Sequence, residues 1–177
     1  MRRRPVAAAT AIVVVEALLV WRIGADVALP AFLVAGVAGV VLAMVDLAIK
    51  RLPNTLVLPL YGAGLVLLGL AATVKPDGAS LLRALSGMAG LFGLYLVLAL
   101  LNPAGLGLGD VKLAGALGLY LAWRGWQVLF VGALAGFLLV AVVALALLAT
   151  RRVSRSSELP FGPFMLGGAL LGIVVTG

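Results

Sequence analysis

Residues 126–149 have the sequence WQVLFVGALAGFLLVAVVALALLA, which contains no charged side chain. About 20 consecutive apolar residues are enough to cross the hydrocarbon core of a bilayer as an α-helix. Strands of a membrane barrel would instead alternate apolar and polar residues over segments of roughly ten. The unbroken run therefore predicts a membrane-spanning helix.

The composition of the whole chain agrees with this reading. Of its 177 residues, 64% are hydrophobic and only 11% are charged, whereas soluble domains carry about 25% charged residues. In a bilayer the backbone must satisfy its hydrogen bonds within helices or closed barrels. We therefore expect an all-α, polytopic membrane helix bundle that forms a single domain over residues 1–177, with the lipid bilayer as its solvent.

Apolar runs separated by polar or helix-breaking residues predict about six or seven transmembrane helices. The first run follows a basic N-terminus, as in a signal peptide, but no soluble domain follows it, so we expect an uncleaved span. The predicted spans are residues 6–23, 27–46, 55–74, 80–101, 106–123, 126–149 and 160–176.

The net charge of +7 is explained by membrane topology, because the basic residues lie in short clusters between the apolar runs. If the N-terminus is inside the cell, nine of the 13 basic residues fall on the inner side. Because basic loops remain in the cytoplasm, we expect a multi-pass protein of the cell's inner or cytoplasmic membrane with a cytoplasmic N-terminus. Nucleic acid is not expected as a partner. The basic residues assigned to the outer side are Arg22, Lys75, Arg83 and Arg124.

The absence of cysteine and histidine excludes disulfides, thiolate sites, histidine-dependent triads and the commonest zinc ligand. We expect no metal site and no cofactor. Six carboxylates remain, and Asp26, Asp77 and Glu158 fall in predicted loops. Glu16 lies inside the first span, and the sequence indicates no role for it.

Asp46 and Asp110 each lie at the end of an apolar run, where a carboxylate is costly and often functional. Two predicted spans separate them, so both fall on the cytoplasmic side. Two carboxylates that meet in a poorly solvated site do not easily both ionise. Such a pair can take a proton from water and polarise a peptide carbonyl, which is aspartic protease chemistry. The spacing alone fits two unrelated interface carboxylates equally well.

The residues around Asp46 and Asp110 indicate how the chain is shaped at each carboxylate. The second Asp follows a glycine-rich segment, GLGLGDVK at residues 105–112, which lets the backbone approach a substrate closely. A nucleotide-binding loop is disfavoured, because no preceding strand is expected and no Gly-Lys-Ser/Thr follows. The first Asp opens the segment DLAIKRLPN at residues 46–54. We expect Pro53 to end the preceding helix and Asn54 to cap the next one.

Three motifs together resemble those of type IV prepilin peptidases, a family of Gly-x-Gly-Asp membrane aspartyl proteases. Residues 107–110 match the Gly-x-Gly-Asp signature. Residues 46–54 resemble the Asp-(x)-Arg-Ile-Pro-Asn segment, with Leu52 in place of the frequent Ile. Residues 159–164, LPFGPF, resemble the Pro-Phe-Gly-Pro segment that opens the last helix in that family.

The resemblance implies an intramembrane aspartic endopeptidase that cleaves the leader peptide of type IV prepilins or pilin-like secretion proteins at the cytoplasmic membrane face. It implies Asp46 and Asp110 as the catalytic pair. Many family members carry a cysteine-containing N-terminal domain that methylates the new N-terminus, and we expect the short form without it. The other candidate site residues are Gly107 and Gly109 in the active-site loop, Lys112, Arg51 and Asn54 for substrate contact or tuning, and Pro160, Phe161, Gly162 and Pro163 as a structural motif.

Three other classes of protein are alternatives to this interpretation. Presenilin-like enzymes pair Tyr-Asp with a later Gly-x-Gly-Asp and a Pro-Ala-Leu segment, whereas Val45 precedes Asp46 here. A proton-coupled small membrane transporter would place carboxylates near the midplane and show repeated halves, and the sequence shows neither feature. A structural component of a pilus or secretion assembly is the third alternative, and a cleavage assay that compares the protein with each Asp→Asn variant would distinguish it from a peptidase.

Overall fold

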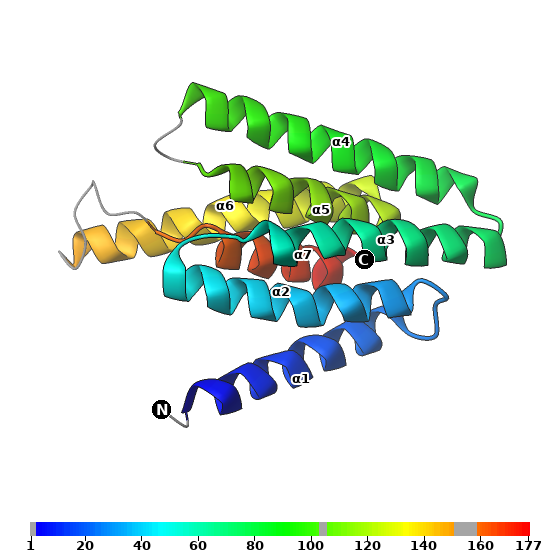
Figure 1. Cartoon of the computed structure of the whole chain (residues 1–177), viewed down its shortest axis with the longest axis horizontal. Helices are drawn as coiled ribbons and strands as arrows, with labels where there is room; N and C mark the ends of the chain where they lie inside the picture. The colour runs from blue at the N-terminus through cyan, green and yellow to red at the C-terminus, as the bar shows by residue number, and fades with distance from the viewer. Residues whose placement is uncertain (1–2, 103–105, 151–158) are drawn as a thin grey trace.

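The protein is seen here as a computed structural model that describes residues 3–102, 106–150 and 159–177. These residues form helices, and helices that follow one another in the chain run in opposite directions (Figure 1). The seven helices of the described segments are α1 (Arg3–Ile23), α2 (Leu29–Ile49), α3 (Asn54–Val74), α4 (Gly78–Leu101), α5 (Leu108–Arg124), α6 (Trp126–Ala149) and α7 (Gly162–Thr176). Each of the predicted spans corresponds to one of them.

Most of these helices have the dimensions of membrane spans. Helices α1, α2, α3, α4 and α6 are long and apolar enough to cross a bilayer, whereas α7 is a shorter apolar helix of 15 residues. Large apolar side chains cover the outward faces, such as Val66 on α3 and Val142 on α6, which are 60% and 64% exposed. Such a surface suits lipid as the solvent. The chain is a multi-pass membrane protein, and the predicted all-α bundle is confirmed.

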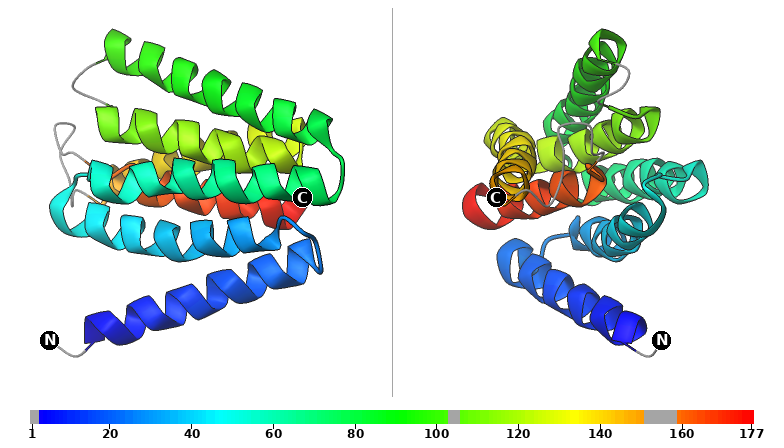
Figure 2. Two further views of the ribbon diagram at one scale, coloured as in Figure 1. Left: turned by 45° about the vertical axis from the view of Figure 1, so that its right-hand side comes forward. Right: turned by 90° about the vertical axis from the view of Figure 1, so that its left-hand side faces the viewer.

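Helix α5 is the centre of the bundle. It packs against α3, α4, α6 and α7, and the end-on view in Figure 2 shows it enclosed by them. Eleven of its 17 residues are buried. At 17 residues α5 is shorter than α1, α2, α3, α4 and α6, which have 21 to 24 residues each.

Close contact between α4 and α5 depends on two glycines. A Cβ atom at Gly87 would lie 2.8 Å from the carbonyl oxygen of Gly118, and one at Gly118 would lie 3.1 Å from Met88 Cα. Small residues at helix crossings let membrane helices approach closely, so that backbone and side-chain atoms gain packing contacts. This crossing fixes the position of α5 against α4.

Arginine side chains hold the helix ends at one end of the bundle. Arg83 Nε donates to the carbonyl of Ala122 at 2.6 Å, and its Nη2 donates to Trp123 at 2.7 Å. Arg22 Nε donates to the carbonyl of Val174 at 2.9 Å. Cations at helix C-termini satisfy the last carbonyls and interact favourably with the helix dipole. These contacts stabilise the end of the bundle at which α5 and α7 terminate.

The connection between α2 and α3 differs from the predicted one. Helix α2 ends at Ile49, and Lys50 takes a left-handed conformation with φ 50° while its N–H donates to the carbonyl of Asp46. Pro53 is the N-cap of α3, and Asn54 is the first helical residue. The predictions that Pro53 ends α2 and that Asn54 caps α3 were therefore wrong. The left-handed turn stops α2 before the proline is reached.

Candidate active site

The Asp46 carboxylate lies near the C-terminal end of α2 and faces the start of α7. Asp46 is only 4% exposed, and its Oδ2 accepts a hydrogen bond from the N–H of Gly162 at 3.0 Å. A Cβ atom at position 162 would lie 2.8 Å from this oxygen. The approach therefore requires glycine. The first backbone N–H groups of a helix are free donors and favour a carboxylate, so the start of α7 is a suitable partner for Asp46.

Asp110 lies in the first turn of α5 and is half-buried. Its Oδ2 accepts a hydrogen bond from the N–H of Gly107, the N-cap of α5, at 3.1 Å. A carboxylate at the third helical position commonly reaches back to the N-cap in this way. The glycine-rich segment thus directs Asp110 toward the end of the bundle where α5 begins.

Leu52, in the connection between α2 and α3, lies beside two glycines that adjoin the two carboxylates. A Cβ atom at Gly109 would lie 3.0 Å from Leu52 Cβ, and one at Gly162 would lie 3.4 Å from Leu52 Cδ1. Gly109 directly precedes Asp110, and Gly162 donates to Asp46, so both carboxylates are attached to backbone that lies beside Leu52. Figure 2 shows the end of α2 and the starts of α5 and α7 at the same end of the bundle. The structure therefore brings together the two carboxylates that the sequence places on one side.

Aromatic side chains pack beside this pair. Tyr95 of α4 stacks on Phe161 with ring centroids 6.1 Å apart, and Phe137 of α6 lies 5.4 Å from each of these two rings. Phe161 directly precedes Gly162, the donor to Asp46, so this aromatic cluster adjoins the Asp46 side of the site. Neither Tyr95 nor Phe137 lies in a sequence motif that indicates a site residue. The only signal for Tyr95 was a phenol near the end of an otherwise apolar span, in the same half of the bilayer as the two Asp residues.

The other candidate residues occupy different places. Lys112 Nζ donates to Asn54 Oδ1 at 2.9 Å, and the hydroxyl of Tyr61 donates to the backbone carbonyl of Lys112. These bonds join the start of α3 to the first turns of α5. Arg51 is exposed. Lys112 and Asn54 are therefore hydrogen-bond partners of each other, which the sequence did not predict.

The Pro160–Pro163 segment leads into α7. Phe161 is the N-cap of that helix and Pro163 lies in its first turn, where the fixed φ of proline is favourable. The segment was predicted to be structural, and the contact of Gly162 with Asp46 shows that it also takes part in the site's hydrogen bonding. Within the described segments, no group of three Asp or Glu side chains lies together as a metal site would require.

Two adjacent carboxylates, each held by one backbone N–H, can divide the roles of acid and base. Two carboxylates that meet in a poorly solvated site do not easily both ionise, so such a pair can hold one proton between them. The charged carboxylate can accept a proton from water, and the neutral one can donate to a substrate oxygen. The arrangement is chemically suited to metal-free hydrolysis of an amide.

The chain is similar in sequence to a known peptidase family and to several of its curated members. The model of the type IV leader peptidase family matches residues 31–150. A prepilin leader peptidase/N-methyltransferase of Aeromonas salmonicida is 38% identical over 127 residues, which cover 71% of this chain and 42% of the relative. A protein of the same name from Pseudomonas putida is 34% identical over 147 residues, with 82% and 49% covered. One from Burkholderia pseudomallei is 37% identical over 140 residues, with 75% and 43% covered.

The chain therefore spans less than half the length of these curated relatives. The matched family segment includes both carboxylates and the glycine-rich turn, and it ends before α7. No solved structure matches the chain significantly.

Proposed function

The chain belongs to the type IV leader peptidase family, and we propose that it is an intramembrane aspartic endopeptidase that removes the leader peptide from type IV prepilins or pilin-like secretion proteins. The observation that carries the proposal is that Leu52 lies against both Gly109, the residue before Asp110, and Gly162, the donor to Asp46. The relatives are named for the same peptidase step. The proposal covers this step, within one peptidase domain formed by residues 1–177, and leaves aside the methyl transfer in their names.

In the proposed mechanism Asp46 and Asp110 are the catalytic residues and share one proton. The charged carboxylate takes a proton from a water molecule as the water oxygen bonds to the scissile carbonyl carbon. The neutral carboxylate donates to the carbonyl oxygen. The C–N bond then breaks and the leaving nitrogen takes a proton, which gives a leader with a free carboxylate and a mature protein with a new amine. The backbone donors Gly162 and Gly107 hold the two carboxylates in position.

The remaining candidate residues support this centre. We propose that Gly107 and Gly109, which have no side chain, leave room beside the turn before Asp110 for a substrate strand to approach. Lys112 and Asn54 fix α5 against α3 through their hydrogen bond. Arg51 is exposed next to the site and is available for substrate contact.

We propose that the site faces the cytoplasm from a cell inner or cytoplasmic membrane. Nine of the 13 basic residues fall on the side of the two carboxylates when the helices alternate across the bilayer. The partners are then a prepilin or pseudopilin and the surrounding lipid, and no nucleic acid is involved. A reporter fused after Arg152 should report the cytoplasm, and one at Asp77 should report the outside. Both reporters on one side would refute this arrangement.

The proposed chemistry is tested with Asp46→Asn, Asp110→Asn and the double variant, purified and assayed on a prepilin in liposomes. Each single variant should lose cleavage while thermal unfolding shows a folded protein. The double variant should be hardly worse than either single one, because residues that act as a unit are not additive. Substantial turnover by either single variant would rule out the shared-proton mechanism.

A further inference from the structure

A groove of about 430 Å³ lies between α3 and α4 and reaches Lys112 of α5. It is open because α3 and α4 each pack more closely on α5 than on each other. Among the described residues that line it, Lys112 is the only charged one. The other lining residues are Leu58, Tyr61 and Leu65 of α3, with Met88, Ala89 and Phe92 of α4.

The ammonium group of Lys112 lies at the membrane-surface end of this groove. Lys112 is in the second turn of α5, and helical side chains tilt toward the N-terminus of their helix. Its Nζ donates to Oδ1 of Asn54, the first residue of α3, at 2.9 Å. The charge is therefore level with the end of the membrane span that α3 forms.

The contact with Asn54 leaves the charge of Lys112 available to a ligand. An ammonium group has three N–H donors, and the bond to Asn54 uses one of them. The side-chain amide of Asn54 is neutral, so this bond does not neutralise the lysine. The hydroxyl of Tyr61 is already engaged, because it donates to the backbone carbonyl of Lys112. The groove thus combines one cation with apolar walls.

The groove has the length of one lipid leaflet. Leu58 and Leu65 lie four and eleven residues after Asn54, which corresponds to about 6 and 16 Å along α3. Half of the hydrocarbon core of a bilayer is about 15 Å thick. The groove therefore runs from the membrane surface to about the middle of the bilayer.

These dimensions suit an acyl chain and not a peptide helix. Over the seven residues from Leu58 to Leu65, a helix about 10 Å wide would occupy roughly 800 Å³. The groove offers about 430 Å³. A spanning helix would also continue through the second leaflet, beyond the residues that line the groove. A thin, flexible chain with an anionic headgroup matches both the shape and the charge, and basic pockets between membrane helices bind such headgroups.

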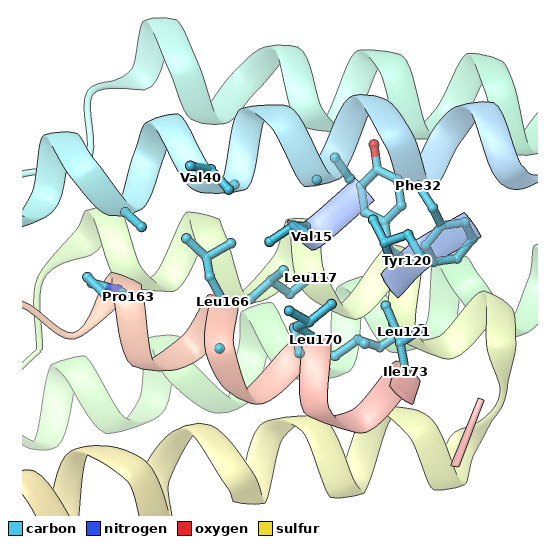
Figure 3. Close-up of a pocket in the computed structure, with 17 residues that line it drawn as sticks. Val15, Phe32, Val40, Leu117, Tyr120, Leu121, Pro163, Leu166, Leu170 and Ile173 are labelled. Atoms are coloured by element: carbon cyan, nitrogen blue, oxygen red, sulfur yellow. The ribbon is translucent and has the colours of Figure 1, made fainter. Parts of the chain in front are cut away.

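A second cavity provides a comparison. It measures about 210 Å³ and lies between α1, α2, α5 and α7, with Val40 and Leu166 in its walls (Figure 3). Apolar cavities of this kind accept apolar ligands. No charged residue lines it among those that the structure describes, and the hydroxyl of Tyr120 donates to the carbonyl of Leu60 at 2.9 Å. This cavity therefore has no group that would select a charged headgroup.

We propose that the groove binds one anionic phospholipid, with its phosphate on Lys112 and an acyl chain between α3 and α4. Under the orientation proposed above, this lipid belongs to the cytoplasmic leaflet. A zwitterionic lipid fills the apolar part equally well, but its own cation offsets the charge of its phosphate. The bound lipid joins α3 to α4 and holds Lys112, two residues after Asp110. The inference does not depend on the peptidase proposal, because it needs only the groove and the charge.

Photoreactive lipids test the site directly. Vesicles contain trace phosphatidylglycerol or phosphatidylcholine with the same photoreactive acyl chain, and labelled peptides are identified by mass spectrometry. Residues 58–65 and 88–92 should be labelled about fivefold more by phosphatidylglycerol, the preference expected for one lysine near a membrane surface. Labelling around Val40 and Leu166 should show no preference. Equal labelling of the groove by the two lipids, or the same preference at both places, would overturn the proposal.

Three variants assign the preference to the ammonium group. Lys112→Met keeps the apolar stem and should abolish the preference for phosphatidylglycerol. Lys50→Met is the matched control: Lys50 is exposed just after α2, and its loss should change the preference by less than about twofold. Asn54→Ala breaks the bond to Lys112 but keeps the charge, so the preference should remain. An equal loss in Asn54→Ala and Lys112→Met would assign the effect to the contact between α3 and α5 and refute the lipid site.

Filling the groove tests the acyl-chain contact. Ala89 is an exposed residue of α4 that lines the groove, so Ala89→Trp should lower labelling of residues 58–65 several-fold. The matched control is Ala141→Trp, at an exposed position of α6, which should leave this labelling unchanged. Thermal unfolding shows whether both variants are folded. Phosphatidylglycerol should also raise the thermal midpoint of the unmodified protein more than that of Lys112→Met, because a ligand of the folded state stabilises it. Equal labelling in the two Trp variants would overturn the proposal.

A substrate segment is the competing occupant. Adding prepilin to vesicles with the Asp110→Asn variant should leave lipid labelling of the groove unchanged, and loss of this labelling would assign the groove to the substrate and overturn the lipid site. Cleavage by the unmodified protein is measured separately. Normal cleavage without a lipid preference leaves the peptidase proposal standing and overturns this one. A lipid preference without any cleavage supports the lipid site and overturns the proposed function.

Discussion

Replacing Gly162 with Ala tests whether the start of α7 positions the Asp46 carboxylate. The new Cβ would lie 2.8 Å from Asp46 Oδ2 and 3.3 Å from Cγ, whereas ordinary contact begins at 3.4 Å. The carboxylate must therefore move by several tenths of an ångström, and the 3.0 Å hydrogen bond from Gly162 is disrupted. The neighbouring Leu52 Cδ1, at 3.4 Å, allows the methyl group itself. The perturbation is thus directed at the carboxylate.

The expected loss follows from this one contact. A hydrogen bond to a charged group contributes about 1.5–3 kcal/mol. Since 1.36 kcal/mol corresponds to a factor of ten in rate, kcat should fall by about 10- to 150-fold. The assay is prepilin cleavage in liposomes, with thermal unfolding in detergent to show that the helices still assemble.

Gly69→Ala on α3 is the control, because no heavy atom lies within 4 Å of its new Cβ. It should retain wild-type activity. Wild-type turnover by Gly162→Ala would refute the role assigned to α7. An unfolded Gly162→Ala variant would show that the glycine is needed for packing of the helices. That result would also contradict the specific role of Gly162 in positioning Asp46.

Three further predictions concern packing, helix coupling and pH. Gly118→Ala should lower the stability by about 1–3 kcal/mol through overpacking, because its Cβ would meet the Gly87 backbone, whereas Gly90→Ala meets nothing within 4 Å; equal thermal midpoints would contradict this. A double-mutant cycle with Lys112→Met and Asn54→Ala should give a coupling of about 0.5–1 kcal/mol in unfolding, and zero coupling would show that their bond does not hold α3 to α5. Hydrogen bonds from the side chain and backbone of Ser80 lower the pKa of Asp77 below 3.8. The stability that ionised Asp77 contributes is therefore present above its unfolded pKa and lost as the pH falls through the lower folded pKa. On acidification, the thermal midpoint of the unmodified protein should drop more than that of Asp77→Asn. Parallel pH profiles of the two proteins would refute the capping role of Asp77.

Much of the fold follows from elementary constraints on a chain in lipid. The seven helices were predictable from the apolar runs, and their ends differ from the predicted ends by a few residues at most. The convergence of the two Asp residues at one end was also predictable, because an even number of crossings separates them. Their catalytic roles remain predictions based on resemblance and geometry.

Details of the candidate site were not accessible in the same way. Asp46 and Gly162 are 116 residues apart in the chain, and nothing local indicates their hydrogen bond. Tyr95 and Phe137 were missed because an aromatic residue in an apolar span fits lipid contact as well as packing near a site. Asn54 was assigned to a cap by its residue type, but the backbone reaches the helical conformation one residue earlier, which leaves its side chain free for Lys112.

The sequence by itself determined that the chain is a membrane helix bundle, and it indicated which carboxylates share a side. It could do so because lipid leaves backbone groups no partner outside a helix, and because each crossing changes the side. Only the tertiary structure decided which helix lies at the centre, which backbone N–H meets Asp46, and that Glu16 of α1 lies against Gly36 of α2. These features depend on how each helix is rotated about its axis. Helices that are apolar on every face carry little sequence signal for that rotation, and close packing of small residues determines it instead.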